Sequence, residues 1–208
     1  RADFGGQVER SLNLVDGVLL LGDSSGGPLR QTRFVLNNAF EEDLPVILVI
    51  NKIDRSDARI DEVVEEVYDL FIDLDANDKQ IEFPIIYTNA KDGIAHESLN
   101  DESKNLNPLL NLITNFFNGP ETDDLSEPQF LVTNLSYDPY VGQVAIGRLD
   151  NGTLKMNNQY SLCGKDETIN NQKFSALYTF KGLEKVKVDK LESGDIIAVA
   201  GIDNIKIG

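Results

Sequence analysis

Four consecutive residues, Asn51-Lys52-Ile53-Asp54, combine side chains that could recognise a guanine base. Guanine presents two neighbouring donors, the ring N1–H and the exocyclic N2 amine, and an ionised carboxylate can accept both. Asp54 could be that carboxylate, and adenine, which lacks the donor pair, would leave its charge unpaired. Asn51 carries a donor and an acceptor, so it could bond the base edge and tie neighbouring loops together. Lys52 could lay its methylene stem along the base or ribose and keep its ammonium near phosphate and water.

A predicted strand delivers these residues to the edge of a sheet. Pro45 is followed by an unbroken aliphatic run at 46–50, which is typical of a parallel strand buried on both faces. Open α/β sheets bind their ligands at the carboxyl ends of such strands. The run therefore predicts that residues 51–54 lie where a ligand would bind.

A second loop, Thr88-Asn89-Ala90-Lys91, follows another predicted strand at 83–87 and should reach the same edge. It resembles the Ser-Ala-Lys signature of GTPases, just as residues 51–54 match their guanine-specificity motif Asn-Lys-x-Asp. The resemblance implies that the backbone N–H of Ala90 meets the guanine carbonyl and that Lys91 flanks the base. Asn89 stands where GTPases usually have serine, but it keeps a hydrogen-bonding side chain. The predicted guanine pocket, which includes no catalytic residue and no metal ligand, consists of Asn51, Lys52, Ile53, Asp54, Asn89, Ala90 and Lys91.

Two other interpretations compete with this pocket. Asn-Lys-x-Asp arises by chance about once in forty chains of this length, a risk that the second loop reduces. Residues 22–29, Gly-Asp-Ser-Ser-Gly-Gly-Pro-Leu, look like the run around the nucleophile of chymotrypsin-like proteases, but an extra serine breaks the spacing. The general base would have to be His96, which follows the serine instead of preceding it and falls in a polar loop. We interpret residues 22–29 as a turn.

Strands and helices alternate through the first 118 residues. Apolar residues at helical spacing predict helices at 29–40, 60–74 and 106–117 and a short one around 8–12. The helix at 60–74 is expected to have Ser56 or Asp57 as its N-cap. With strands at 18–21, 45–50 and 83–87, the pattern predicts an α/β fold with a mostly parallel sheet and crossover helices.

Residues 119–128 predict a domain boundary, because two prolines and four acidic residues without periodicity suit an exposed linker. Beyond it the pattern changes to short strands and turns. Asn151-Gly152 predicts a type I′ hairpin turn, and residues 196–200 predict a late strand. We therefore expect an α/β domain at 1–120 and a small β-barrel at 121–208.

Composition narrows the class of protein and of partner. With 41% apolar and 26% charged residues, the 208-residue chain is typical of a globular protein of one or two domains. No run is long enough to span a bilayer and no signal peptide opens the chain, so we expect a cytoplasmic protein without a membrane partner. Cys163, the only cysteine, lies in a strand-like run and is predicted to be an inert buried thiol.

The net charge of −16 argues against DNA and against a general nucleic-acid surface. Four lysines nevertheless gather within ten positions, at Lys181, Lys185, Lys187 and Lys190. They could form a local phosphate-binding patch or a solvated hairpin, and both interpretations stay open.

Longer blocks resemble the BipA/TypA family of translational GTPases, which is related to elongation factors G and Tu. In the first domain these blocks are residues 2–10, 15–21, 27–36, 50–59, 69–71 and 83–84. In the second they are residues 140–142, 146–149 and 152–155, of which the last is typical of domain II of translation factors. The resemblance covers essentially the whole chain.

This resemblance implies a partial P-loop GTPase G domain followed by a translation-factor β-barrel, domain II. It implies a GTP-binding, GTP-hydrolysing factor that acts with the bacterial ribosome in ribosome assembly and stress adaptation. The intact parent would use GTP or GDP with Mg²⁺, and its partners would be ribosomal RNA and proteins. The alternative is a non-catalytic ribosome- or protein-binding module with a vestigial nucleotide site.

Part of the family's site is missing from the 208 residues. They contain no Gly-x-x-x-x-Gly-Lys-Ser/Thr phosphate loop, and Arg1 stands where the family has its water-orienting histidine. We therefore expect an internal fragment, without P-loop and switch I, that neither hydrolyses GTP nor binds it tightly. The missing phosphate-binding strand should uncover apolar surface at residues 18–21. On its own the first domain is then expected to be marginally stable or to self-associate.

Overall fold

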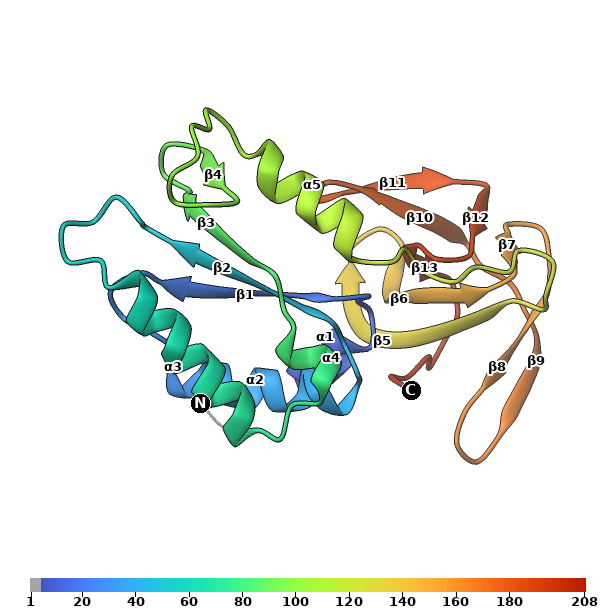
Figure 1. The fold of residues 1–208 in the computed structure, drawn as a ribbon. Helices are drawn as coiled ribbons and strands as arrows, with labels where there is room; N and C mark the ends of the chain where they lie inside the picture. Colours follow the sequence, from blue (N-terminus) through green and yellow to red (C-terminus); the bar gives the residue numbers. More distant parts are fainter. Residues whose placement is uncertain (1–4) are drawn as a thin grey trace. The chain divides into compact units, whose positions relative to one another are not determined.

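The computed structural model describes residues 5–208, and the chain forms two compact units that meet in sequence between Gly119 and Pro120 (Figure 1). The first unit contains helices α1 (Gly5–Leu12), α2 (Arg30–Glu41), α3 (Ile60–Asp73), α4 (Asp78–Ile81) and α5 (Asn107–Phe116). Its strands are β1 (Val18–Asp23), β2 (Val46–Asn51), β3 (Ile85–Asn89) and β4 (Ile94–His96).

The strands of the first unit form one sheet in the order β1-β2-β3-β4. β1 pairs with β2 and β2 with β3 in parallel, because a helix carries the chain back after each of the first two strands. β4 is antiparallel to β3 and ends at His96, which was expected in a loop. The predicted α/β class with a mostly parallel sheet is confirmed, and β4 was missed because three residues show no usable periodicity.

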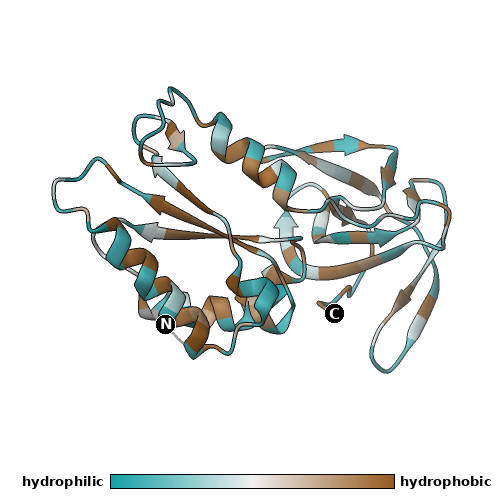
Figure 2. Ribbon diagram, in the orientation of Figure 1, coloured by the Kyte–Doolittle hydropathy of each residue, from teal (hydrophilic) through white to brown (hydrophobic). Residues whose placement is uncertain are grey.

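Both faces of this sheet are covered. α2 and α3 cover one face and α5 the other (Figure 1). Leu36, Val63 and Phe71 pack onto the sheet from α2 and α3, and the apolar side of α5 packs against Ile47 and Val49. β2 is apolar up to its last residue, Asn51 (Figure 2), and its residues 46–50 are buried. The prediction of a strand buried on both faces is confirmed. Because β2 is packed on both faces, it fixes the position of Asn51 at its carboxyl end.

β1 lies at the edge of the sheet as the structure describes it, with β2 as its neighbour. Leu21 is 65% exposed, and Leu19 is also exposed. Apolar surface is therefore uncovered on this strand, as we expected for residues 18–21.

The second unit is all-antiparallel β structure, which confirms the predicted class of this half of the chain. Its strands are β5 (Gln129–Asp138), β6 (Gly142–Asn151), β7 (Thr153–Lys155), β8 (Tyr160–Cys163), β9 (Thr168–Gln172), β10 (Ala176–Lys181), β11 (Glu184–Val188), β12 (Lys190–Glu192) and β13 (Ile196–Ala200). Five of them form a sheet in the order β11-β10-β13-β6-β5, and β12 pairs with β7 and β8 with β9. Leu149, Leu177 and Ile197 are fully buried in its apolar core.

Two predictions for the second unit were wrong. Asn151-Gly152 is not a hairpin turn, because β6 pairs with β5 and β13 whereas β7 pairs with β12. Gly152 has a φ of 73°, and its N–H donates to the carbonyl of Asp123. Cys163, predicted to be buried, is exposed because it ends the two-stranded β8–β9 ribbon.

Residues 120–128 belong to the second unit and are hydrogen-bonded to the rest of it. The Asp124 carboxylate accepts hydrogen bonds from the backbone N–H and the hydroxyl of Ser193 at 2.9 and 2.8 Å. These bonds hold the pKa of Asp124 below its ordinary value. Within residues 5–208, no helix is long and apolar enough to cross a membrane.

Candidate functional site

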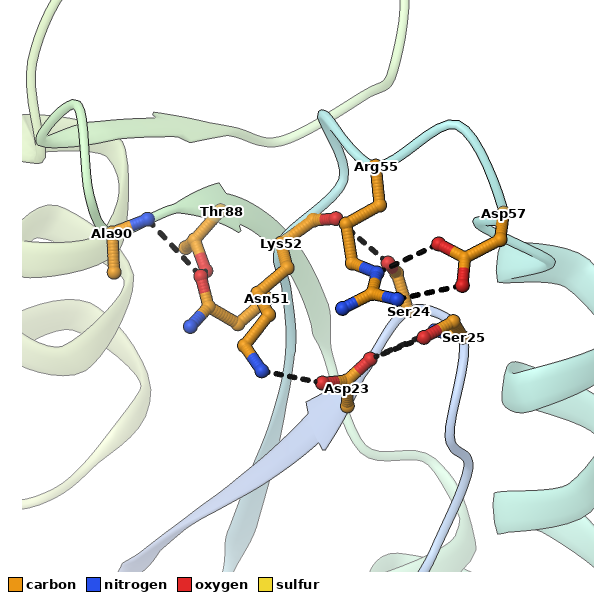
Figure 3. A network of polar contacts seen from close by, with 9 residues as sticks. All are labelled: Asp23, Ser24, Ser25, Asn51, Lys52, Arg55, Asp57, Thr88 and Ala90. Atoms are coloured by element: carbon orange, nitrogen blue, oxygen red, sulfur yellow. Dashed lines mark hydrogen bonds and ion pairs between the residues drawn. The ribbon is translucent and has the colours of Figure 1, made fainter.

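The seven predicted guanine-pocket residues gather at the carboxyl ends of β2 and β3 (Figure 3 shows the polar contacts there). Asn51 is the last residue of β2, and residues 52–54 form the turn that follows it. β3 extends through Asn89, so Thr88 and Asn89 belong to the strand and the loop begins at Ala90. That loop is one strand over from the first, as the parallel pairing of β2 with β3 requires.

Asn51 ties the two loops together. Its Oδ1 atom accepts hydrogen bonds from the Thr88 hydroxyl and from the Ala90 N–H, each at 3.0 Å (Figure 3). The backbone adds a second link, since the Ile53 N–H donates to the Thr88 carbonyl at 3.3 Å. The Ala90 N–H, which was expected to meet a guanine carbonyl, is thus donated to Asn51 here. Across residues 5–208 the Nδ2 amide of Asn51 has no hydrogen-bond partner and stays available.

Asp54 differs from the other acidic residues around it. Asp23 and Asp57 are both paired, whereas the exposed Asp54 carboxylate makes no hydrogen bond or ion pair with any described residue. An exposed carboxylate without a partner can accept two donors at once. This is the property that recognition of guanine N1–H and N2 would need.

Asn89 and Lys91 have different roles at the end of β3. The buried Asn89 side chain donates through Nδ2 to the Asp92 carboxylate at 2.7 Å and accepts the Asp92 N–H at 3.3 Å. It therefore closes the turn. Lys91 is exposed and, within the described part of the chain, forms no ion pair, so its stem and ammonium are free to approach a ligand.

Both the backbone and the ammonium group of Lys52 have a defined position. Its backbone has a φ of 63°, in the left-handed region, and its ammonium pairs with Asp23 Oδ2 at 2.7 Å. The hydrogen bond from Lys52, together with those from the N–H and hydroxyl of Ser25, holds the pKa of Asp23 well below its ordinary value.

Asp23 was missed as a site residue by sequence reasoning. It ends β1 in register with Asn51, so the signal was an acidic residue at the carboxyl end of a neighbouring parallel strand.

The residues after Asp54 form a clamp on the turn at 23–27. The Arg59 guanidinium pairs with Glu66 at 2.5 Å and donates to the Ser25 carbonyl at 2.8 Å. Arg59 is also the N-cap position of α3, so the prediction of Ser56 or Asp57 there was wrong. Residues 52–58 form successive turns, so α3 begins only after them. Asp57 does not cap the helix but forms an ion pair with Arg55 through two hydrogen bonds.

The protease interpretation fails on geometry. Ser24 is fully buried, and its hydroxyl donates to the Lys52 carbonyl at 2.7 Å. His96 lies in β4 with Nδ1 at 2.8 Å from the Asp101 carbonyl. The Ser25 hydroxyl, the other candidate, donates to the Asp23 carboxylate at 2.8 Å, so neither serine is hydrogen-bonded to His96, which a serine nucleophile would need as its base.

The polar groups left without a partner at this edge differ in their chemistry. The segments at the carboxyl ends of β2 and β3 thus carry, among the described residues, a carboxylate without a partner at Asp54, a free amide donor at Asn51 Nδ2 and a free cation at Lys91. No group of three or more His, Cys, Asp and Glu side chains among residues 5–208 could hold a metal ion. An acceptor, a donor and a cation of this kind could hydrogen-bond a heterocyclic base.

Comparison with protein families and relatives gives a consistent result. The family described as elongation factor Tu GTP binding domain matches residues 1–118, and elongation factor Tu domain 2 matches residues 142–208. The chain is 43% identical over its whole length to the large ribosomal subunit assembly factor BipA of Bacillus subtilis, and 44% identical over 207 residues to the putative elongation factor TypA-like SVR3, chloroplastic, of Arabidopsis thaliana.

These matches cover 34% and 31% of the two relatives, so the chain spans about a third of their length. Among solved structures, the translation elongation factor SelB of Methanococcus maripaludis in its apo form aligns with a TM-score of 0.68 over 100% of this chain and 42% of that one. At 21% identity, the likeness to SelB supports the fold alone.

Proposed function

The chain belongs to the elongation factor Tu GTP-binding domain family, as a homologue of the BipA/TypA translational GTPases, and from this premise we propose that residues 51–54 and 88–91 are the guanine-recognition half of a GTP site. The observation that carries the proposal is the Asn51 bridge. The hydrogen bonds that its Oδ1 accepts from Thr88 and Ala90 hold both loops at one edge of the sheet, and the Asp54 carboxylate, three residues on, has no partner among the described residues.

Each residue has a distinct task in this proposal. Asp54 accepts the N1–H and N2 donors of guanine, and Asn51 Nδ2 donates to the base edge. The Ala90 N–H turns from Asn51 Oδ1 towards the guanine carbonyl, while the Thr88 hydroxyl keeps Asn51 in place. Lys52 and Lys91 flank the base with their methylene stems, and Asn89 supports them by closing the turn with Asp92.

The intact parent protein is proposed to bind and hydrolyse GTP with Mg²⁺, and to act with the ribosome in the cytoplasm. Two observations support this: the family match, and relatives named for large ribosomal subunit assembly. Mg²⁺ and a phosphate loop position and neutralise the transferred phosphoryl group in such enzymes. The 208 residues contain no Gly-x-x-x-x-Gly-Lys-Ser/Thr run. We therefore propose that they bind guanine nucleotides weakly and do not hydrolyse GTP.

A titration followed by ¹⁵N NMR tests the proposal, because it detects weak binding. GMP should shift the amide signals of residues 51–54 and 88–91, with Ala90 among the most affected, and AMP should not. Equal shifts with GMP and AMP would contradict guanine selection. No shift with GMP would favour a non-catalytic binding module instead. A titration with fluorescent GDP tests the claim of weak binding, since micromolar or tighter affinity for GDP would refute it.

A further inference from the structure

The turn that follows β1, at residues 24–27, lies outside the proposed guanine pocket but is bound closely to the guanine motif. The Ser24 N–H donates to the Asn51 carbonyl at 2.9 Å, and the Ser24 hydroxyl donates to the Lys52 carbonyl at 2.7 Å. Ser24 is fully buried between these bonds. The turn thus holds residues 51 and 52 of the guanine motif in place from the side of β1.

Lys52 needs such a grip because its backbone is in an uncommon conformation. A non-glycine residue with a φ of 63° is sterically strained and persists where its surroundings hold it. The Lys52 carbonyl accepts from the Ser24 hydroxyl and from the Arg55 N–H, the latter at 3.1 Å. The backbone of Lys52 is therefore fixed independently of any ligand.

The Lys52 side chain is fixed by a different group. Asp23 uses its two oxygens separately: Oδ1 accepts from the Ser25 N–H at 3.0 Å and from the Ser25 hydroxyl at 2.8 Å, and Oδ2 pairs with the Lys52 ammonium at 2.7 Å (Figure 3). Because Ser25 orients the carboxylate, Asp23 offers the ammonium one defined position. A lysine side chain otherwise has about 2 kcal/mol of rotamer entropy to lose on ordering.

We propose that Asp23 is a positioning residue of the guanine site, which holds Lys52 in a ready conformation before nucleotide arrives. The inference rests on the proposed guanine function. Lys52 then loses little further conformational entropy when its stem packs along the base. Guanine nucleotides therefore bind more tightly than they would if the Lys52 side chain were not held by Asp23. Base selection stays with Asp54, since the Asp23 carboxylate is hydrogen-bonded to Ser25 and Lys52 and not to Asp54.

Asp23→Asn tests this, since it keeps the shape and the Ser25 bonds but removes the charge that holds Lys52. Two readouts are measured in the 208-residue chain: the Lys52 side-chain ammonium signal without ligand, and the GMP affinity by ¹⁵N NMR titration. Asp23→Asn should broaden or abolish the ammonium signal and weaken GMP binding about threefold to fivefold. Asp23→Glu should restore part of the affinity.

A double-mutant cycle separates positioning from folding. Lys52→Met keeps the stem and removes the ammonium, so Asp23→Asn should have no further effect on GMP affinity in that background. Asp73→Asn is the matched control, because Asp73 forms an exposed ion pair with Arg33 at 3.3 Å in the same unit, and it should change neither readout.

The outcomes distinguish this inference from the function on which it rests. Guanine-selective shifts in the wild type with unchanged affinity in Asp23→Asn would overturn the inference alone. An equal loss of affinity in the wild-type and Lys52→Met backgrounds would also overturn it, because Asp23 would then act through the fold. Absence of GMP-dependent shifts in the wild type would overturn the guanine function and the inference with it.

Discussion

The Oδ1 atom of Asn51 accepts the backbone N–H of Ala90 at 3.0 Å, across 39 positions of sequence. This bond joins the ends of two neighbouring parallel strands, and the Thr88 hydroxyl shares the same acceptor. The two halves of the proposed guanine pocket are therefore held together before any ligand binds. A site preassembled in this way loses less conformational entropy on binding.

Asn51→Ala should loosen this edge of the sheet. The buried Thr88 hydroxyl keeps only a long contact of 3.4 Å to the Ile50 carbonyl, and the Ala90 N–H loses its acceptor. We expect a loss of about 1–2 kcal/mol in the free energy of unfolding of the first unit, from urea unfolding followed by NMR. Hydrogen exchange at the Ala90 amide should accelerate.

The control for Asn51→Ala is Asn37→Ala. Asn37 makes one exposed side-chain bond, to Glu41 on the surface of α2, and its loss should cost under about 0.5 kcal/mol. Equal effects of the two substitutions would mean that the Asn51 bridge has no special structural weight.

Gly27→Ala should destabilise the first unit more than Gly93→Ala does. Both glycines have left-handed φ values, 67° and 70°, so alanine is strained by about 1 kcal/mol at either. A Cβ on Gly27 would also collide with the Glu66 carboxylate and approach the Arg59 guanidinium within 3.2 Å, whereas one on Gly93 would meet nothing within 4 Å.

We expect about 2 kcal/mol for Gly27→Ala against about 1 kcal/mol for Gly93→Ala, measured by urea unfolding, because the partly exposed Glu66 carboxylate can move aside only by giving up its ion pair with Arg59. A Gly27→Ala variant as stable as Gly93→Ala would show that the Arg59–Glu66 pair yields without cost.

The stabilising effect of the Asp23–Lys52 pair should depend on pH. The pKa of Asp23 is lowered in the folded chain from an ordinary value of 3.8, chiefly by the hydrogen bond from Lys52. A lowered folded-state pKa means that the stabilisation is complete above that ordinary value and is lost as the pH falls through the folded-state pKa.

Asp23→Asn should therefore cost a constant amount of unfolding free energy between pH 5 and pH 8, roughly 1 kcal/mol or less because both side chains are partly exposed. The difference from the wild type should shrink below pH 3.8. A difference that grows on acidification would contradict the ion pair.

Leu21→Lys should reduce self-association of the chain. β1 is an edge strand in the described structure and carries the exposed Leu19 and Leu21, a combination that favours pairing with a second copy. Sedimentation velocity at high micromolar concentration should show less dimer for Leu21→Lys than for the wild type. Ile72→Lys, at an exposed position on α3, is the control and should leave association unchanged.

The parts of the fold that could be predicted were those with strong local signals. The aliphatic run at 46–50 and the helical spacing at 60–74 each agree with their tertiary surroundings, so β2 and α3 were placed within one residue or nearly so. Asn151-Gly152 has an equally strong local signal but was misread, because pairing of β7 with β12 overrides it. Of the features expected for a type I′ turn, the positive φ at Gly152 is observed.

In the site, sequence patterns located the residues but not their partners. The motif placed Asn51 and Asp54 at a strand end, whereas the partner of Lys52 depends on the register between β1 and β2. Asn89 shows the same limit: it was placed in the pocket because it stands where GTPases usually have serine, and its side-chain hydrogen bonds go to Asp92. Such pairings are set by tertiary register, which no short pattern encodes.

The central claim is that Asp54 selects guanine, and the change Asp54→Asn tests it most directly. An amide at this position can donate to the C2 carbonyl of xanthine but cannot accept both guanine donors. In ¹⁵N NMR titrations the wild type should prefer GMP to XMP by at least about tenfold, and Asp54→Asn should reverse the preference. An Asp54→Asn chain that still prefers GMP by the wild-type factor would contradict the account.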